Sequence, residues 1–470
     1  MSQSTQVAIL GAGPSGYTAA FLAAAHGFST VLVDAAAQPG GVCLQRGCIP
    51  SKALLHVARL LLETREAASM GLQFAPPVVD LERVRTWKAE VVQRLTQGLG
   101  EQCQRRGVTF IQGQGRLLDD HTLLVQRADG GEERLAFAQC ILATGSRPAG
   151  LPGLDPTLPG ILDSTQALAL TAIPRTLLVV GGGNIGLELG TVYAALGSAV
   201  SVVEMAEGLL PGADRDLVRP VAQRLARLFA SVQTNTRVVA VQAEEGGLRV
   251  TLQSGETRTE QQVERLLVAT GRLPNSQSLG LETVGIVPER GFVSVGADKR
   301  TAVPHILAIG DLIGGPLLAH KAAHDARMAV ATLLGRPPAG QRVMPAVTYT
   351  DPEVAYAGLT ETAARQQGIT VRTVRFPWAA SGRAHTLERT EGLTKWVVDP
   401  QSERVLGVGI VGVNAGELLA TGVQAIERGL TVGEVAQTIY PHPTLAETLL
   451  ESAEVFAGEC VHYYAPRRER

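Results

Sequence analysis

The sequence has few cysteines, few aromatic residues and almost no net charge. Five cysteines in 470 residues are too few for a disulfide scaffold, so any disulfide here is expected to be catalytic. A formal charge of −2 argues against nucleic-acid binding and leaves no polybasic segment for a membrane surface. No apolar run of about 18 residues lacks glycine or charge, and the first residues form no signal-type segment, which predicts a soluble, cytoplasmic protein without a membrane span.

Glycine and small apolar residues are abundant. The chain has 52 glycines and a 45% hydrophobic share, of which aromatic residues make up little. This composition is typical of an α/β protein with glycine-rich turns, built on Ala, Val and Leu. At ~150 residues per domain, the length allows about three domains.

A strand–glycine loop–helix pattern opens the chain. The apolar residues 7–10 lead directly into Gly11, Gly13 and Gly16, and an Ala-rich helical run follows. In this pattern the first glycine makes a tight turn, the second lets the backbone meet a pyrophosphate, and the third lets helix and strand pack closely. A second apolar strand ends in Asp34, placed to bond a ribose hydroxyl. The pattern predicts a dinucleotide site.

The same pattern recurs in the middle of the chain. The apolar residues 176–180 lead into Gly181, Gly183 and Gly186, and the next strand ends in Glu204. In both copies the acid follows the first glycine by 23 residues. Two units imply two dinucleotide sites. The carboxylate of Glu204 favours NAD over NADP, because it accepts the 2′-hydroxyl and repels a 2′-phosphate.

Later strands close both units. Residues 140–145 and 266–271 are apolar strands that end in Thr-Gly, at Gly145 and Gly271, where a cofactor is expected to lie. A further strand ends in Asp311, at the sheet edge where open α/β sheets bind ligands, although a helix cap explains this acid equally well.

Residues 40–52 place two cysteines before a helix. Cys43 and Cys48 follow the pair Gly40 and Gly41, which permits a close backbone approach, and an apolar helical run is expected from about Ala53. A helix N-terminus favours a thiolate, the form that attacks disulfides. The pattern suits a redox-active pair; two buried structural cysteines are the alternative.

The C-terminal region has a different sequence pattern. A Pro/Gly-rich linker at 335–340 precedes alternating strands and helices with no nucleotide-binding motif. His442 stands beside Pro443, which fixes the local backbone and can be cis. Thr444 and Glu447 fit a capping box, which alone could explain the acid. Alternatively, Glu447 orients and charges the imidazole of His442 for general acid–base work.

With these residues in place, the chain resembles the dihydrolipoamide dehydrogenases, the lipoamide branch of the pyridine nucleotide–disulfide oxidoreductases, over essentially its whole length. The most specific segments are Gly40–Lys52, Gly181–Gly190, Ala269–Arg272, Ala308–Asp311, Ala319–Lys321 and His442–Glu447. The chain lacks the terminal cysteine pair of a mercuric reductase, and it has both active-site cysteines, unlike a soluble transhydrogenase.

The resemblance implies an α/β fold with two Rossmann-like dinucleotide-binding domains and a C-terminal α+β dimerisation domain. It implies an FAD-binding domain at 1–150, an NAD-binding domain at 151–274, a central domain completing the FAD site at 275–345, and an interface domain at 346–470.

The resemblance also implies cofactor roles. FAD would be held by the first glycine motif (Gly11, Gly13, Gly16), Asp34, Gly41, Gly115, Gly145, Asp311 and Ala319, with an ion pair of Lys52 and Glu188 near its reactive edge. NAD would be held by the second motif (Gly181, Gly183, Gly186), Glu204, Val238, Gly271 and Arg272. No metal is implied.

The implied activity is the NAD-dependent oxidation of protein-bound dihydrolipoyl groups. Cys43 would be the interchange thiol that meets the lipoyl group, and Cys48 would face the isoalloxazine as a thiolate, after opening of a Cys43–Cys48 disulfide. His442 would be the base and Glu447 its partner, both reaching the active site of the other subunit of a homodimer. The alternatives are an NADH-linked reductase of another disulfide and a scaffold component of a multienzyme complex.

Three residues depart from the family's usual pattern. Asp34 stands where Glu is more common, Gln45-Arg46 replaces Asn and a small apolar residue, and Asp325 also stands in place of Glu, with no role that the sequence indicates.

Arg46→Val is expected to lower the redox potential of the cysteine pair. The reason is that Arg46 should stabilise the Cys48 thiolate and thereby favour the reduced form, with ~30 mV equal to about 1.4 kcal/mol for two electrons. Redox titration of the variant beside the native protein measures this, and an unchanged potential would dismiss a role for Arg46.

Overall fold

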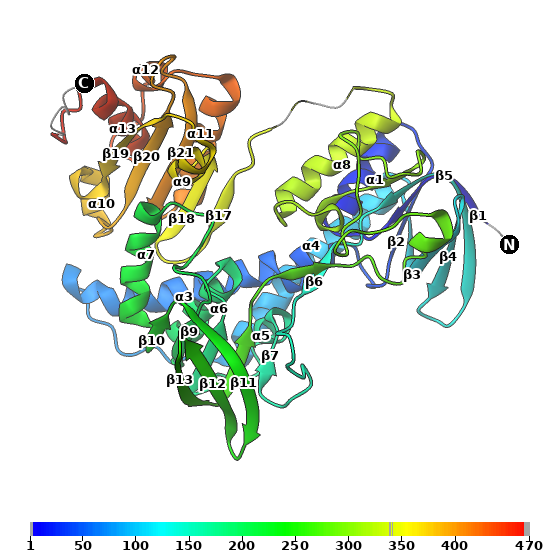
Figure 1. The fold of residues 1–470 in the computed structure, drawn as a ribbon, viewed down its shortest axis with the longest axis horizontal. Coiled ribbons are helices and arrows are strands. Elements are labelled where there is room, and N and C mark those ends of the chain that lie inside the picture. Colours follow the sequence, from blue (N-terminus) through cyan, green and yellow to red (C-terminus); the bar gives the residue numbers. More distant parts are fainter. Residues whose placement is uncertain (1–2, 338–339, 341, 465–470) are drawn as a thin grey trace.

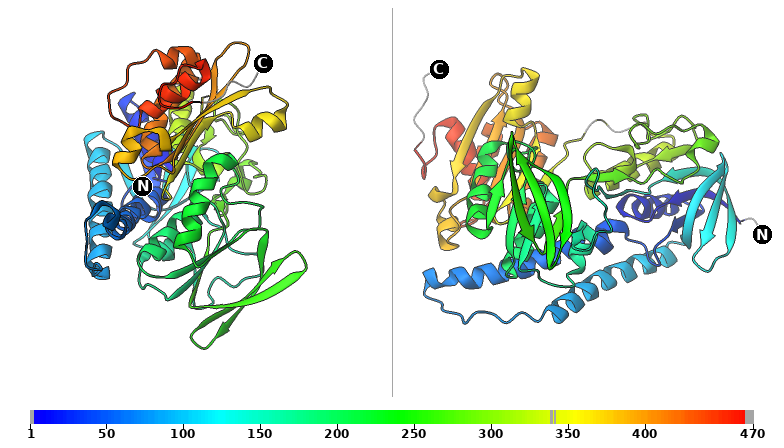
Figure 2. Two further views of the ribbon diagram at one scale, coloured as in Figure 1. Left: turned by 90° about the vertical axis from the view of Figure 1, so that its left-hand side faces the viewer. Right: turned by 60° about the horizontal axis from the view of Figure 1, so that its bottom comes forward.

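A computed structural model describes residues 3–337, 340 and 342–464 (Figures 1 and 2). Two nucleotide-binding units and a C-terminal sheet make up the molecule, which confirms the predicted fold class. Figure 1 shows the first unit on the right, the second below the centre and the C-terminal sheet at the upper left. Residues 338–339 of the expected linker lie outside the described residues.

The first unit is a six-stranded sheet. β16 pairs with β5, so a segment far along the chain completes the sheet that the N-terminus begins. Its strands are β1 (Gln3–Leu10), β2 (Thr30–Asp34), β3 (Thr109–Asp119), β4 (Thr122–Arg127), β5 (Glu132–Leu142) and β16 (Ile306–Ala308). Its helices are α1 (Pro14–Ala25), α2 (Gly41–Arg46), α3 (Cys48–Glu66), α4 (Leu81–Arg105) and α8 (Ala319–Leu333), with short turns η1 (Ala67–Met70), η2 (Leu281–Val284) and η3 (Gly310–Ile313).

The second unit is a parallel five-stranded sheet in the order β10-β9-β8-β14-β7, with an antiparallel sheet of three strands beside it. The parallel strands are β7 (Ile161–Leu162), β8 (Thr176–Val180), β9 (Ala199–Val203), β10 (Ser231–Gln233) and β14 (Arg265–Val268); the others are β11 (Thr236–Glu244), β12 (Gly247–Ser254) and β13 (Thr257–Val263). Helices α5 (Ser164–Ala169), α6 (Asn184–Ala195) and α7 (Arg215–Leu228) surround them. A ribbon of β6 (Ser146–Pro148) and β15 (Arg272–Pro274) links the two units.

The C-terminal region is one antiparallel sheet in the order β17-β18-β21-β20-β19. Its strands are β17 (Ala346–Thr348), β18 (Glu353–Gly358), β19 (Arg372–Pro377), β20 (Leu393–Val398) and β21 (Val405–Gly412). Its helices are α9 (Glu361–Gln367), α10 (Gly382–Thr386), α11 (Ala415–Arg428), α12 (Val432–Ala436) and α13 (Glu447–Ala457), with a short turn η4 (Trp378–Ala380).

Each glycine loop follows a strand that has a parallel neighbour on either side, at the point where the strand order changes direction. In each unit the first strand is flanked by the second strand on one side and by a later strand on the other, β5 or β14. Open α/β sheets bind ligands at this point, outside the carboxyl ends of the strands. The fold therefore presents two equivalent ligand positions, one per unit.

The expected start of the helix after the cysteines was wrong. Helix α3 begins at Cys48 rather than near Ala53, and the N–H of Ser51 donates to Gly47 O at 3.0 Å. Pro50 does not prevent this, because it lies in the first turn, where an N–H has no partner within the helix.

A buried ion cluster joins the second unit to the C-terminal sheet. Lys395 on β20 is 1% exposed, and its Nζ lies 2.7 Å from Asp214 Oδ2 and 2.8 Å from Asp216 Oδ1, at the start of α7. Burial alone would raise the pKa of Asp214, but the hydrogen bond and charge of Lys395 lower it to about 2. The ammonium thus compensates two carboxylates withdrawn from water.

Lys395→Met is expected to lower the free energy of unfolding by about 3–5 kcal/mol, because it leaves Asp214 without its buried cation. The urea midpoint at fixed protein concentration measures this, with Arg105→Met in the exposed Arg105–Glu101 pair as a control that changes little. Because the folded pKa of Asp214 lies below its ordinary 3.8, the native contribution is present above about pH 4 and is lost as the pH falls toward 2. Equal midpoints for Lys395→Met and the control would contradict the role of the cluster.

Candidate active site

The two cysteines lie on consecutive helices that meet at a glycine. Cys43 is in the middle of the short helix α2, and Cys48 is the first residue of α3, with Gly47 between them. The short helix α2 was not expected, because a helical run was predicted only from about Ala53. Cys48 therefore faces the unpaired N–H groups at the start of a 19-residue helix.

No disulfide joins the two cysteines in this structure, and each thiol shifts the pKa of the other. The hydrogen bond from Cys43 lowers the pKa of Cys48 to about 7; burial opposes the shift, and the charge of Lys52 adds to it. The same hydrogen bond and burial raise the pKa of Cys43. Of the two thiols, Cys48 is therefore the one on which a negative charge is favoured.

Arg46 is the exposed last residue of α2, and no ion pair joins it to another residue in the described part of the chain. The cation that lowers the pKa of Cys48 is Lys52, one turn further along α3. Only the family resemblance implied a role for Lys52, so its electrostatic effect on Cys48 is a finding of the structure. The expected effect of Arg46 stays a prediction.

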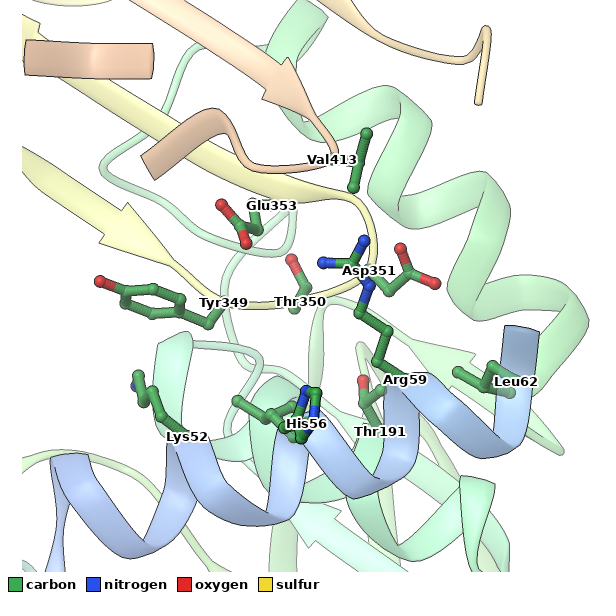
Figure 3. Close-up of a pocket in the computed structure, with 11 residues that line it drawn as sticks. Lys52, His56, Arg59, Leu62, Thr191, Tyr349, Thr350, Asp351, Glu353 and Val413 are labelled. Carbon is green, nitrogen blue, oxygen red and sulfur yellow. The ribbon is translucent and has the colours of Figure 1, made fainter. Parts of the chain in front are cut away.

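Lys52 and Glu188 form the ion pair that the resemblance implied. Lys52 Nζ lies 2.7 Å from Glu188 Oε2, with the two side chains 35% and 7% exposed. Glu188 Oε1 accepts the backbone N–H of Tyr349 at 3.0 Å, so both oxygens of this buried carboxylate have partners. A cavity of about 210 Å³ adjoins the pair (Figure 3).

The first glycine loop fits a bound pyrophosphate. A Cβ on Gly11 would meet Ala143 O at 2.3 Å and a Cβ on Gly16 would meet Gly11 O at 1.7 Å, so the protein itself requires both glycines. Gly13 is different: a Cβ there would meet nothing closer than Gly41 Cα at 3.9 Å, and its φ of −73° suits any residue. Glycine at this position keeps open the space that a pyrophosphate would use.

The second loop repeats these features. Gly181 and Gly186 are required by close contacts with Ala269 O and with Gly181 O, whereas a Cβ on Gly183 would meet nothing within 4 Å. The loop opens into a cleft of about 1100 Å³, whose lining includes Glu204, Val238 and Gly271. The structure therefore offers a second dinucleotide-sized site; Arg272 is not among the residues lining it.

The acids at the ends of the second strands bind the glycine loops themselves. Asp34 Oδ2 accepts the N–H of Ala12 at 2.6 Å, and Glu204 Oε2 accepts the N–H of Gly182 at 2.7 Å. The remaining oxygen of each carboxylate accepts an N–H two residues further along the chain. Asp34 and Glu204 thus make equivalent hydrogen bonds although their side chains differ in length. Each carboxylate holds its glycine loop in position for a ligand.

Asp311 and Arg272 are joined through a serine. Asp311 Oδ2 accepts from Ser146 Oγ at 2.5 Å, and Ser146 Oγ accepts from Arg272 Nε at 2.7 Å. Arg272 therefore contacts the β6–β15 ribbon between the two units. Burial lowers the pKa of Arg272, and the charge of Asp311 opposes this shift. Asp311 lies in η3 rather than at a helix cap.

Asp325, which had no role by sequence, anchors the loop that carries Asp311. Its carboxylate pairs with Lys299 and Lys321, each at 2.9 Å, and accepts the N–H of Gly310 at 3.2 Å. Lys321 also donates to Gly310 O and Gly314 O. The Lys321 pair has the i,i+4 spacing of a helix, whereas the contacts with Lys299 and Gly310 have no signal in sequence spacing.

Other implied FAD residues lie near the same unit. Ala319 begins α8, and Gly145 has a φ of +70°. A Cβ on Gly115, in β3, would meet Leu10 Cδ1 at 2.5 Å, so packing in the sheet explains this glycine. Gly41 approaches Gly13, since a Cβ on Gly41 would meet Gly13 Cα at 2.5 Å. The expected close backbone approach is present.

His442 and Glu447 form a hydrogen-bonded pair. His442 Nδ1 lies 2.8 Å from Glu447 Oε1, and Glu447 Oε2 accepts the N–H of Thr444 at 2.7 Å. Helix α13 begins at Glu447, so the expected helix start at Thr444 was wrong and the carboxylate serves both the imidazole and the turn. The His442–Pro443 peptide is cis.

The imidazole of His442 is 74% exposed. Among the described residues, no hydrogen bond or ion pair joins it to either cysteine of the same chain. It lies in the segment between α12 and α13 of the C-terminal region, whereas the cysteines lie on α2 and α3. One chain does not bring the two together.

A cluster of Asp120, His121 and His305 brings possible metal-ligand atoms within 4.8 Å of one another. The two imidazole rings stack 4.1 Å apart and nearly parallel, so their planes do not converge on one ion. Each ring also bonds a backbone carbonyl, His121 that of Phe137 and His305 that of Asp120. The cluster serves to hold the β3–β4 turn against the loop before β16.

None of the helices within residues 3–337 and 342–464 is long and apolar enough to cross a bilayer.

Comparisons with known proteins agree with this geometry. Residues 5–326 match the family model "pyridine nucleotide-disulphide oxidoreductase", and residues 344–453 match the dimerisation domain of the same family. The chain is 44% identical to a dihydrolipoyl dehydrogenase of Haemophilus influenzae, over 97% of this chain and 95% of that protein. It is 40% identical to one of Geobacillus stearothermophilus, over 97% of each.

Solved structures are similar as well. LpdA of Mycobacterium tuberculosis superposes with a TM-score of 0.89 at 30% identity, covering 96% of this chain and 99% of that one. The HOCl-induced flavoprotein disulfide reductase RclA of Escherichia coli gives 0.85 at 29% identity, covering 96% and 99%. The C-terminal match identifies a dimer-forming module, and the chain is a homodimer subunit. The chain belongs to the pyridine nucleotide-disulphide oxidoreductase family.

Proposed function

We propose that the protein is a dihydrolipoyl dehydrogenase, which reoxidises protein-bound dihydrolipoyl groups and reduces NAD+ to NADH. The observation that carries the proposal is the placement of Cys43 on α2 and Cys48 at the start of α3, with the Lys52–Glu188 ion pair one turn further along that helix. The full-length relatives named dihydrolipoyl dehydrogenase support the substrate class.

FAD and NAD are the cofactors. The first glycine loop, with Asp34 and Asp311, would hold FAD, and the second, with Glu204 and Val238, would hold NAD. Bound FAD supplies the redox chemistry that transfers an electron pair from the cysteines to NAD as a hydride. Lys52 and Glu188 would then lie near the edge of the flavin.

The cysteines and the base perform the sulfur chemistry. His442 Nε2 is left free by the Nδ1 bond to Glu447, and it takes the proton of one lipoyl thiol. The lipoyl thiolate attacks Cys43 Sγ, the Cys43–Cys48 bond breaks, and Cys48 leaves as a thiolate. The second lipoyl thiol then displaces Cys43, so the lipoyl group is oxidised by two electrons and the cysteine pair is reduced.

His442 would act on the partner subunit. Its exposure, and the lack of any hydrogen bond or ion pair between it and the cysteines among the described residues, support a site completed across the dimer. Glu447 stabilises the imidazolium that forms when His442 takes the proton. The lipoyl-bearing protein would approach this shared site, and the expected compartment is the reducing cytoplasm.

A disulfide reductase of another substrate is the second candidate, favoured by the similarity to the E. coli flavoprotein disulfide reductase. Steady-state rates with dihydrolipoamide, glutathione and other dithiols or disulfides, each with NAD(H) and NADP(H), separate the two. The proposal predicts the highest kcat/KM for dihydrolipoamide with NAD+. A higher value for another pair of substrates would overturn it.

His442→Gln is expected to lower dihydrolipoamide oxidation by about 10²–10⁴-fold, the usual value of a positioned base, while FAD binding and its reduction by NADH remain. His462→Gln is the matched control, because His462 Nδ1 pairs with Glu451 on the same helix at 2.6 Å. Stopped-flow measurement of both half-reactions checks this. Full dithiol oxidation by His442→Gln would remove the residue from the mechanism.

The thiolate of Cys48 is expected to form with a midpoint near pH 7, because Cys43 and Lys52 stabilise its charge. The measurement is the pH dependence of Cys48 alkylation in a Cys43→Ser background, where serine keeps the hydrogen-bond donor, followed by mass spectrometry. Cys460, whose pKa burial raises, is the internal control with a higher midpoint. Lys52→Met should raise the midpoint of Cys48; coincident curves for the two cysteines would refute the assignment.

A further inference from the structure

The residue that holds Lys52 in place comes from the C-terminal part of the chain. Tyr349 follows β17, and its ring centroid lies 4.3 Å from Lys52 Nζ, within the range of a cation–π contact. Figure 3 shows the two side chains together at one end of the cavity, with Arg59 and Asp351 at the other. The ring and the carboxylate of Glu188 are thus two separate contacts of one ammonium group.

The backbone of Tyr349 completes a closed set of three contacts. Its N–H donates to Glu188 Oε1 at 3.0 Å, while Glu188 Oε2 binds Lys52 at 2.7 Å. The neighbouring Thr348 donates its hydroxyl to Asn184 Oδ1 at 3.0 Å, also on α6. The turn between β17 and β18 is therefore fixed to α6 on both sides of the ring contact.

Burial of the ring does not explain Tyr349. The residue is 38% exposed, and its hydroxyl hydrogen bonds to no other residue that the structure describes. A tyrosine kept for packing would be covered, and one kept for its hydroxyl would have a partner. The contact that remains is the one between the ring face and the ammonium.

The position of Lys52 matters because its neighbour has the opposite charge. Lys52 lowers the pKa of Cys48 and Glu188 raises it, so the field at Cys48 depends on how far the ammonium stands from the carboxylate. The other ionisable groups that act on this thiol are Cys43, Tyr17, Arg272 and Tyr349 itself. With its side chain 35% exposed, Lys52 has room to turn toward water if the ring is removed.

We propose that Tyr349 is a positioning residue, whose ring face and backbone N–H hold the Lys52–Glu188 pair where Lys52 stabilises the Cys48 thiolate. The C-terminal part of the chain thereby acts on the redox centre of its own subunit. This role rests on the proposed function in one respect only, which is that the reaction uses the Cys48 thiolate.

The test compares three substitutions in the holoenzyme with the Cys43→Ser background. Tyr349→Phe keeps the ring face and the N–H and should leave the alkylation midpoint of Cys48 unchanged. Tyr349→Leu keeps only the N–H and should leave about two- to five-fold less thiolate at a pH below both midpoints. Tyr349→Trp offers a ring that binds a cation more strongly, so it should not raise the alkylation midpoint of Cys48.

The action through Lys52 is tested in a Lys52→Met background. There Tyr349→Leu should produce no further shift, because the ammonium that the ring holds is gone. An equal shift in both backgrounds, or a rise in the midpoint with Tyr349→Trp, would overturn the proposal. If Tyr349→Leu does not retain flavin, Tyr349→Met replaces it in both backgrounds, because methionine also removes the ring face and keeps the N–H.

The experiment uses no dithiol substrate, so its result is independent of which disulfide the enzyme serves. A native-like midpoint in Tyr349→Leu together with normal dihydrolipoamide oxidation would remove the positioning role and leave the proposed function intact. A shifted midpoint in an enzyme that does not oxidise dihydrolipoamide would support the positioning role and contradict the proposed function.

Discussion

Stabilisation of a thiolate at Cys48, the first residue of α3, is the constraint around which the candidate active site is arranged. A hydrogen bond from Cys43, the start of the helix and the ammonium of Lys52 all favour this charge, while burial opposes it. Lys52 can act only because Glu188 and Tyr349 hold it between α3, α6 and the turn after β17. Three distant segments of the chain must therefore fold together before the thiol pair becomes reactive.

The two nucleotide units reuse one local solution. In each, two glycines are required by contacts within the protein, and a third, Gly13 or Gly183, is required by none. In each, a carboxylate at the end of the second strand binds the loop it faces. The repeated geometry places two dinucleotide positions on one chain, and the C-terminal sheet, fixed by Lys395, adds the dimer-forming module.

Short-range chemistry made much of this predictable from sequence. Glycine spacing located both loops, and the apolar pattern predicted strands β8 and β9. The position of the two cysteines before a helix indicated a redox-active pair. Tertiary pairing was not predictable. The pairing of Asp325 with Lys299, the contact of Tyr349 with Lys52 and the cluster around Lys395 join residues far apart in the chain. The early start of α3 depends on Pro50 being tolerated in a first turn.

The most direct test of the central claim is NADH formation from dihydrolipoamide and NAD+ by holoenzyme in which Cys48 is replaced by serine. The account predicts that Cys48→Ser binds flavin as the native protein does but forms NADH at a background rate, because no thiolate remains to receive the electron pair. NADH formation at the native rate in that variant would contradict the account.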